Sequence, residues 1–421
     1  MLYQLSHVRV SGAIGPDQGL TVTDERANFQ SAVACRAHIA ARVPGRRPPG
    51  ASVGAMTSPA DARADASAAF RGLRARGVAE HIDVTRESHR LAEGGFWVLV
   101  GTFEGRIDAW RFSEVRAVDA VKEPADAGRA WHGPRADSWR TSLSREEYMA
   151  GVQAIRDHIR EGEVYQANLC RVLEAPLPAG SHGPDAVALS QLLARGNPAR
   201  YASRIVIPGD GEVPGTWIVS ASPELYLAVD GPVVTSSPIK GTAATGQPML
   251  PKDESENIMI TDLIRNDLSH VAVPGSVTVP ELLGRHAHPG LDHLQSTVAA
   301  TLEAEFDWTE RMWSALLDGT FPPGSVSGAP KESALNIIRS LEPVPRGPYC
   351  GAIGWIDADA RRAELAVGIR TFWWEDQGGG VLSFGTGAGI TWGSHAEGEW
   401  EETELKARRL IALASLDTMS P

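Results

Sequence analysis

Hydrophobic and polar residues alternate most regularly in the part of the chain that follows residue 140. Ser144 and Glu147 have the spacing of a capping box, and apolar residues then recur every three or four positions until about Gly162. This spacing predicts a helix. Residues 164–173 instead alternate with a period of two, which predicts a strand.

The same criteria predict a long series of further elements. Strands are expected at residues 201–207, 216–222, 224–229, 233–237, 349–358, 362–375 and 381–390. Helices are expected at residues 185–196, 256–271, 308–318, 330–341 and 396–415. Adjacent strands with helices interspersed, and no regular βαβα rhythm, favour an α+β fold with a large, mainly antiparallel β-sandwich core surrounded by helices.

The first 125 residues carry a weaker pattern. Residues 94–105 are typical of a strand pair, but no chemical signature is visible elsewhere in this segment. The polar stretch 122–139, with its glycines and prolines, indicates a linker or an exposed crossover. We therefore expect a divergent subdomain over residues 1–125 and a second domain over residues 140–416, packed into one globular unit.

Composition and charge exclude several classes of function. The 421 residues are 43% hydrophobic and 22% charged, as in a soluble globular protein. A formal net charge of −12 argues against a nucleic-acid partner and against an anionic membrane surface. No apolar run approaches the ~20 residues of a membrane span, and the first residues lack the pattern of a secretory signal. The three cysteines have no CxxC spacing, which suits a reducing cytoplasm without structural zinc.

Lys240, in the stretch SSPIKGTAAT (residues 236–245), is a candidate functional residue. Lys240 follows a short apolar run and precedes Gly241, and lysines at strand ends usually lie in solvent. Glu224 could approach the same pocket if residues 230–232, Asp-Gly-Pro, turn a hairpin. A carboxylic acid beside a lysine can divide into acid and nucleophile if desolvation tunes both pKa values.

Acidic pairs with the same spacing mark the starts of two predicted helices. Asp253 and Glu256 form the first pair, and Glu399 and Glu402 form the second. Acidic residues in a first helical turn ordinarily stabilise the helix macrodipole. The alternative is that the two helices each offer a carboxylate to one Mg²⁺, an ion that prefers oxygen ligands and keeps several waters.

Two glycine-rich stretches and two isolated polar residues also allow two interpretations. Residues 322–333 and 385–391 lack the endings of nucleotide-binding loops, so they either form turns or present backbone N–H groups to an anion. His293 and Arg370 lie in apolar surroundings, where single polar residues are more often structural than catalytic.

Nine motifs occur in the same order as in chorismate-utilising enzymes: SASPELYL, SPIKGT, ENIMITDLIRNDL, PGSVTVPEL, HLQSTV, PPGSVSGAPKESALNIIRSLEP, YCGAIGWI, GIRTF and EGEWEETELKA. The resemblance covers roughly residues 140–415. Within the family the chain is most similar to component I of aminodeoxychorismate synthases, with component I of anthranilate synthases next. The resemblance implies an α+β fold around a β-sandwich, chorismate as substrate and Mg²⁺ as cofactor.

The resemblance also implies roles for single residues. Glu256 and Glu402 match the magnesium ligands of the family, with Glu399 assisting. Glu224 matches the general acid that protonates the departing 4-hydroxyl group, and Lys240 matches the lysine of the PIKGT motif, which we interpret as a nucleophile. Further matches lie around the substrate: Gln166, Thr242, His293, Tyr349, Arg370, Gly387, Gly389 and Lys406.

Two positions discriminate between activities in the family. Anthranilate synthases resemble PIAGT where this chain has Lys240. Members that add water to chorismate carry a lysine base where this chain has Gln166, and a glutamine cannot act as that base, so the position indicates ammonia as the nucleophile. The chain departs from the family pattern at Pro323, Asp292 and Ala388, none of which removes a catalytic side chain.

The resemblance therefore implies a cytoplasmic, Mg²⁺-dependent aminodeoxychorismate synthase component I on the route to p-aminobenzoate and folate, or to a specialised metabolite. Ammonia would come from a separate glutamine amidotransferase subunit, because the three cysteine contexts lack a glutaminase nucleophile elbow. Anthranilate synthase component I is the alternative activity. A non-catalytic chorismate-binding module is a remote second alternative.

Overall fold

The computed structural model describes residues 59–118 and 130–416, apart from Ser181, Thr245, Leu250, Pro289, Gly290 and Gln377. The first described segment contains α1 (Pro59–Asp65), β1 (Ser67–Phe70), β2 (Leu73–Asp83), α2 (Val84–Glu87), the 3₁₀-helix η2 (Ser88–Ala92), β3 (Phe96–Gly101) and β4 (Ile107–Ala117). The central elements are β5 (Arg140–Thr141), α3 (Arg145–Arg160), β6 (Gln166–Pro176), α4 (Ala186–Gly196), β7 (Tyr201–Ile207), β8 (Thr216–Ser222), β9 (Leu225–Asp230), β10 (Val233–Ser237), β11 (Ile239–Ala244) and α5 (Pro251–Ser269).

The C-terminal elements complete the order along the chain. They are β12 (Thr278–His288), β13 (Leu291–Thr301), α6 (Met312–Thr320), the 3₁₀-helix η3 (Gly324–Val326), β14 (Gly328–Ala329), α7 (Lys331–Leu341), β15 (Ala352–Asp357), β16 (Arg362–Val367), β17 (Thr371–Glu375), β18 (Val381–Ile390) and α8 (Ala396–Ala414).

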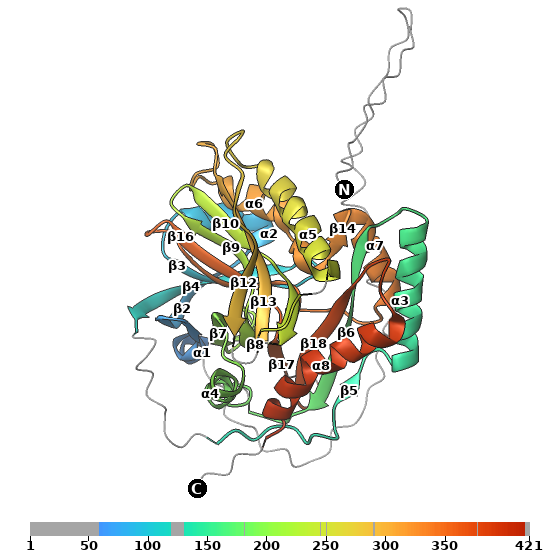
Figure 1. The fold of residues 1–421 in the computed structure, drawn as a ribbon. Helices are drawn as coiled ribbons and strands as arrows, with labels where there is room; N and C mark the ends of the chain where they lie inside the picture. The colour runs from blue at the N-terminus through green and yellow to red at the C-terminus, as the bar shows by residue number, and fades with distance from the viewer. Residues whose placement is uncertain are drawn as a thin grey trace, which may run out of the picture. The chain divides into compact units, whose positions relative to one another are not determined.

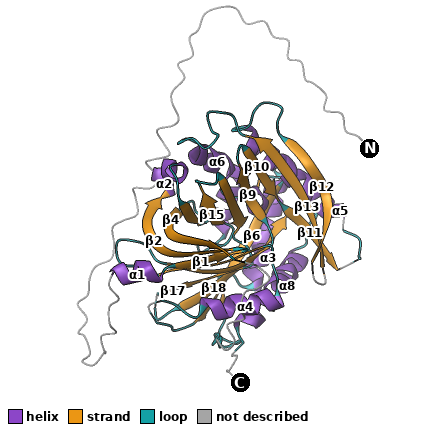
Figure 2. Cartoon of the chain, turned by 90° about the vertical axis from the view of Figure 1, so that its left-hand side faces the viewer, coloured by secondary structure: helices purple, strands orange, loops and turns teal. Residues whose placement is uncertain are grey.

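The strands form one large, curled antiparallel sheet (Figure 2). Neighbouring strands follow the order β12, β13, β10, β9, β16, β15, β3, β4, β2, β1, β7, β8, β17, β18 and β6, and β11 continues beside β13 where β10 ends. Strands from residues 67–117 thus occupy the middle of an order whose two ends come from later in the chain.

Helices surround the sheet in the α+β arrangement that the sequence predicted (Figure 1). Helix α5 packs on β11 and β13, α8 on β18, α4 on β7 and β8, and both α3 and α7 pack on β6. The largest apolar core combines side chains from residues 66–112 with side chains from residues 170–373, including the buried Trp97, Trp110 and Trp313. Burial of this apolar surface is the main favourable term in holding the curled sheet together.

Several predicted elements are confirmed with close boundaries. The capping box is present, since the Ser144 hydroxyl accepts a hydrogen bond from the N–H of Glu147 and the Glu147 carboxylate accepts one from the N–H of Ser144. The predicted strand at 381–390 coincides with β18, and the hairpin at residues 230–232 joins β9 to β10.

Other predictions were wrong in instructive ways. The single strand predicted at residues 362–375 is two strands, β16 and β17, because Arg370 adopts a left-handed backbone conformation with φ of 52° between them. The long β12–β13 hairpin was not predicted. The linker predicted at residues 122–139 stays a prediction, because residues 119–129 lie outside the described part. Of the rest, Arg135 and Asp137 are exposed, whereas Trp131 is 1% exposed and donates a hydrogen bond to the carbonyl of Ala414.

In the described ranges, each helix is too short or too polar for a bilayer crossing. The proposed division at residues 125–140 stays a prediction.

Candidate functional site

Lys240 lies where the two ends of the strand order meet. Its Nζ atom, from β11, is 3.3 Å from the position that a β-carbon would take on Gly389 of β18. Burial lowers the pKa of the lysine, and the nearby Glu256 and Glu224 carboxylates oppose that shift. A lowered pKa increases the fraction of neutral amine, which is the nucleophilic form.

Glu224 lies between β8 and β9 and is 3% exposed. Burial raises the pKa of its carboxyl group, although hydrogen bonds from the Ser325 hydroxyl and the Ile239 N–H and the charge of Lys240 act in the opposite direction. Its Oε1 atom has no hydrogen-bond partner among the described residues. A raised pKa favours the protonated carboxyl group, which is the form that a general acid needs.

Gln166 begins β6 and is completely buried. Its amide lies against the same β-carbon position of Gly389 that faces Lys240. Within the described part of the chain, neither the amide oxygen nor the amide nitrogen has a hydrogen-bond partner. Buried polar atoms are normally paired, so this amide is available to a ligand.

Alternate residues of β18 are glycines, and the absence of their β-carbons leaves room for neighbouring side chains. A β-carbon on Gly385 would collide with the ring of Tyr349, and one on Gly387 would lie 2.5 Å from the sulfur of Cys170. Burial raises the pKa of Tyr349 well above its ordinary value, so this phenol stays protonated. Gly385 therefore lets the ring of Tyr349 approach the strand closely, and Gly387 does the same for the Cys170 sulfur.

The backbone of β18 is partly free of strand neighbours in this region. Among the described strands, β18 pairs with β17 only over residues 381–384, while β6 pairs with it up to Ile390. The ammonium group of Lys406 donates a hydrogen bond of 3.0 Å to the carbonyl of Gly387. The interpretation of residues 385–391 as an anion cradle stays a prediction.

Carboxylates from two helices lie on either side of Lys252. The Lys252 ammonium is 2.9 Å from Oε1 of Glu399 on α8 and 3.6 Å from Oε1 of Glu256 on α5. Burial raises the pKa of Glu256. Burial acts in the same direction on Glu402, but the ammonium of Lys406, 2.7 Å away, together with the charges of Lys252 and Lys240, outweighs it, so the pKa of Glu402 is lowered.

Two of these carboxylates suit a divalent cation. Oε1 of Glu256 and Oε2 of Glu399 are buried and accept no hydrogen bond from any described residue. Mg²⁺ needs only a few carboxylate oxygens and completes its shell with waters. The three predicted ligands do not form one cluster, because no group of three metal-binding side chains occurs in the described ranges. Glu256 and Glu399 fit the ion, and Glu402 is the less direct candidate.

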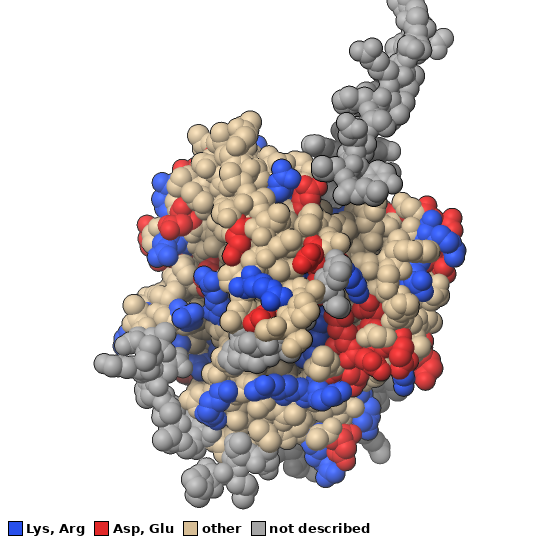
Figure 3. Space-filling view, viewed as in Figure 1, with Lys and Arg blue, Asp and Glu red and all other residues tan. Residues whose placement is uncertain are grey.

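The surface over the first half of α8 is acidic (Figure 3), whereas Lys406, Arg408 and Arg409 are exposed on its second half. Glu397 and Glu401 are exposed on the first half, and Glu404 is partly exposed. A negative surface of this kind raises the local concentration of cations.

Three predicted residues come from elements around this centre. His293 is buried in β13, opposite Thr242 of β11. The side chain of Thr242 lies outside what the structure describes. Arg370 lies at the break between β16 and β17; burial lowers its pKa, and the charge of Glu224 partly offsets this effect. The left-handed backbone of Arg370 is a strained conformation of the kind that is frequent at functional sites.

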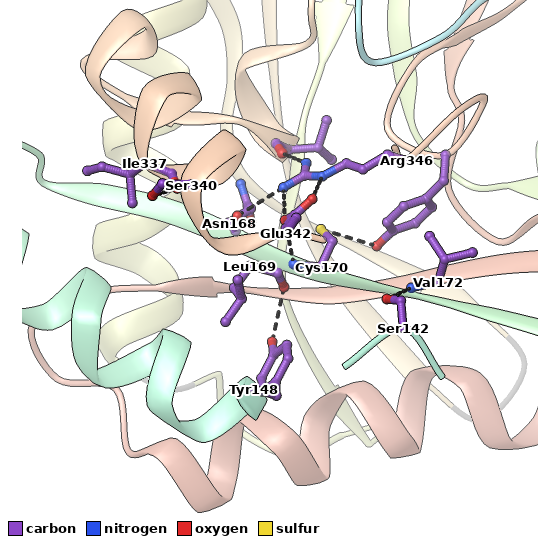
Figure 4. Close-up of polar contacts among 12 residues, drawn as sticks. Ser142, Tyr148, Asn168, Leu169, Cys170, Val172, Ile337, Ser340, Glu342 and Arg346 are labelled. Atoms are coloured by element: carbon purple, nitrogen blue, oxygen red, sulfur yellow. Dashed lines mark hydrogen bonds and ion pairs between the residues drawn. The ribbon is translucent and has the colours of Figure 1, made fainter. Parts of the chain in front are cut away.

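A buried ion pair between Arg346 and Glu342, which was not predicted from the sequence, contacts the strand that carries Gln166 (Figure 4). The Arg346 guanidinium is bidentate to Glu342, with hydrogen bonds of 2.8 and 2.6 Å, and also donates to the carbonyls of Val326 and Asn168. Glu342 in turn accepts a hydrogen bond from the N–H of Cys170. The pair thereby ties α7 and η3 to the strand that begins with Gln166.

The missed residues left little signal in the sequence. Arg346 and Glu342 are four positions apart in a segment that reads as an ordinary helix end. Ser325 lies in a glycine-rich stretch that was noted, and Lys252 precedes Asp253 of the first acidic pair, but their contacts with Glu224 and Glu399 depend on how distant elements pack.

Comparison with known proteins gives a consistent result. A family model described as chorismate binding enzyme matches residues 110–412. The chain is 34% identical to anthranilate synthase component 1 of Saccharolobus solfataricus over 281 residues, which is 64% of this chain and 62% of that protein. It is 33% identical to aminodeoxychorismate synthase component 1 of Klebsiella aerogenes over 355 residues, which is 81% of this chain and 74% of that protein. The match to the relative from Saccharolobus solfataricus thus spans less than two thirds of that protein's length.

The fold is also that of a solved structure. The crystal structure of anthranilate synthase component I from Streptococcus pneumoniae superposes with a TM-score of 0.65 at 19% identity, covering 94% of this chain and all of that chain. At that level of identity the similarity concerns the fold.

Proposed function

The chain belongs to the family of chorismate binding enzymes, and we propose that it acts as an aminodeoxychorismate synthase component 1, which converts chorismate and ammonia to 4-amino-4-deoxychorismate. Relatives named as aminodeoxychorismate synthases and as anthranilate synthases match at similar identity. The choice between the two activities therefore rests on the residues of the site.

The position of Lys240 carries the proposal. Its amine has a lowered pKa and lies beside the unpaired amide of Gln166, and a carboxyl group with a raised pKa, that of Glu224, lies close by. These two shifts favour a larger share of neutral amine and of protonated acid, the forms that covalent catalysis with general-acid assistance uses.

The proposed reaction proceeds in two displacements. The Lys240 amine adds to C2 of the ring, the ring double bonds shift, and the C4–oxygen bond breaks as Glu224 gives its proton to the departing hydroxyl, which leaves as water. Ammonia then adds at C4, the double bonds shift back, and the C2–nitrogen bond breaks to release the lysine. The enolpyruvyl group is retained, so no pyruvate forms.

Glu256 and Glu399 would hold Mg²⁺, with Glu402 nearby, and the bound ion would fix and polarise the carboxylate of the substrate ring. His293, Tyr349 and Arg370 would surround the substrate as the family resemblance implies. Gln166 has no basic group with which to activate water, which favours ammonia as the entering nucleophile.

The source of ammonia is proposed to be a separate glutamine amidotransferase subunit. The designation "component 1" of the relative from Klebsiella implies such a second component. Cys170 and Cys350 are both buried, in contexts unlike that of a glutaminase nucleophile. The product would enter p-aminobenzoate and folate synthesis in the cytoplasm, or a specialised pathway with the same chemistry.

Anthranilate synthase component 1 is the second candidate, because a relative of that name is 34% identical. That reaction eliminates pyruvate and gives an aromatic product. Chromatography of a reaction of the purified chain with chorismate, ammonium and Mg²⁺ separates the possibilities. The proposal predicts aminodeoxychorismate without pyruvate; anthranilate with pyruvate would establish the alternative, and unchanged chorismate would favour a non-catalytic module.

A further inference from the structure

Lys252 occupies the space between the two carboxylates that best suit a metal ion. Its Nζ atom donates a 2.9 Å hydrogen bond to Glu399 and lies 3.6 Å from Glu256, one turn further along α5. Glu399 is 4% exposed, whereas the side chain of Lys252 is 36% exposed. The lysine therefore reaches from the surface into a buried acidic pair and links α5 to α8.

The electrostatics of the pair explain why a cation is held there. Two carboxylates on facing helices repel each other, and burying a charge is costly unless a partner compensates it. The ammonium of Lys252 supplies that partner, but it does not satisfy both groups. Oε1 of Glu256 and Oε2 of Glu399 still accept no hydrogen bond from the described residues.

A divalent cation would bind the same two carboxylates. Mg²⁺ binds carboxylate oxygens at about 2.1 Å. Its two positive charges would repel an ammonium that shares the same two carboxylates, so the two cations compete for this place. The partial exposure of Lys252 gives the displaced ammonium a path, because a lysine can keep its methylene chain on the protein while its charged end moves into water.

Building on the metal site of the proposed function, we infer that Lys252 is an internal counter-cation that Mg²⁺ displaces from Glu256 and Glu399. Lys252 holds the acidic pair together before the metal binds, and its displacement weakens the affinity for the metal. The affinity of the chain for Mg²⁺ is then set by a residue that is not itself a ligand.

Calorimetric titration of the chain with MgCl₂, without chorismate, tests this inference. Lys252→Met should bind Mg²⁺ about tenfold more tightly than the wild type, which corresponds to the release of about 1.4 kcal/mol of competing interaction. Lys252→Arg keeps the competing cation and should bind no more tightly than the wild type. Arg265→Met removes an exposed cation from the same helix, away from the acidic pair, and should change the dissociation constant less than twofold.

Thermal denaturation supplies a second readout. Mg²⁺ should raise the Tm of Lys252→Met by more than it raises that of the wild type, since tighter binding to the folded state gives greater stabilisation. If Lys252→Met does not fold, both measurements are made on Lys252→Gln instead. Equal Mg²⁺ affinities for the wild type, Lys252→Met and Lys252→Gln would overturn the role of Lys252 but leave the metal site in place. Absence of Mg²⁺ binding in every variant would instead remove the metal site on which the inference rests.

Discussion

Lys240 and Gly389 belong to strands near opposite ends of the sheet order, yet the lysine Nζ lies 3.3 Å from where a β-carbon on Gly389 would be. The amide of Gln166 faces the same position. Only a residue without a β-carbon leaves room for both side chains, so the closure of the curled sheet and the architecture of the site depend on each other.

Gly389→Ala should therefore inactivate the enzyme with little effect on its folding. The new methyl group would push Gln166 or Lys240 out of place, and misplacement by about 1 Å can lower a rate ~100-fold. Gly393→Ala is the matched control, because a β-carbon there meets no atom within 4 Å. Steady-state rates and thermal melts of both variants check the prediction; an active Gly389→Ala enzyme would show that the contact is unimportant.

Glu224→Gln should stabilise the chain at neutral pH while removing the general acid. The folded-state pKa of Glu224 is raised from 4.5 by burial. As the pH rises from 4.5 to that raised value, the folded chain keeps a proton that the unfolded chain has lost, so wild-type stability falls by about 1.4 kcal/mol per pH unit relative to the variant. Below that window the difference should level off. Urea denaturation across pH measures it, and parallel stability curves would contradict a raised pKa.

Glu256→Gln and Glu402→Gln should each abolish turnover at limiting Mg²⁺ with the fold retained if both residues are ligands, because an amide is a poorer ligand than a carboxylate for a hard cation. The two residues differ in how closely a lysine holds them. Oε1 of Glu256 is buried, accepts no hydrogen bond from a described residue and lies 3.6 Å from Lys252, whereas Glu402 is 2.7 Å from Lys406. If only one residue proves essential at limiting Mg²⁺, we therefore expect it to be Glu256. Titrating the activity of both variants with MgCl₂ compares their losses of turnover at limiting metal. A variant with near-normal activity at limiting metal loses its assignment as a ligand.

Arg346→Met should destabilise the chain by about 3–5 kcal/mol, because it leaves the buried Glu342 charge without its partner. The double variant Arg346→Met/Glu342→Leu should recover much of that loss. Arg265→Met, which breaks an exposed pair with Asp262, should cost less than about 1 kcal/mol. Denaturant unfolding of the three variants provides the comparison, and equal losses for Arg346→Met and Arg265→Met would refute the supporting role of the buried pair.

The sequence predicted best what is local. The capping box at Ser144 and the strand at residues 381–390 depend on neighbours in the chain, and both are present. The break at Arg370 was missed because a left-handed arginine has no signature in a hydrophobic pattern. The β12–β13 hairpin was missed because its residues lack a clean alternation of polar and apolar positions.

In the candidate site, too, a contact set by a local turn was predicted, and a contact set by the packing of distant elements was not. The hairpin at residues 230–232 allowed an approach between Glu224 and Lys240 to be predicted, and the two residues interact electrostatically in the structure. The bridging position of Lys252 could not be predicted, because the distance between α5 and α8 depends on how the whole sheet curls.

The most direct test of the account is whether Lys240 forms a covalent bond with the substrate. The lysine must be partly neutral to attack, and burial lowers its pKa in the required direction. Lys240→Ala should lose most aminodeoxychorismate formation, and Lys240→Arg should do no better, because a guanidinium keeps its proton.

Mass spectrometry of the wild-type chain incubated with chorismate and Mg²⁺, without ammonia, is the decisive measurement. The account predicts an adduct with the mass of chorismate less one water on the peptide that contains Lys240, and its absence in Lys240→Ala. No adduct in the wild type, together with a Lys240→Arg variant that retains most activity, would contradict the covalent mechanism and leave the lysine an electrostatic role.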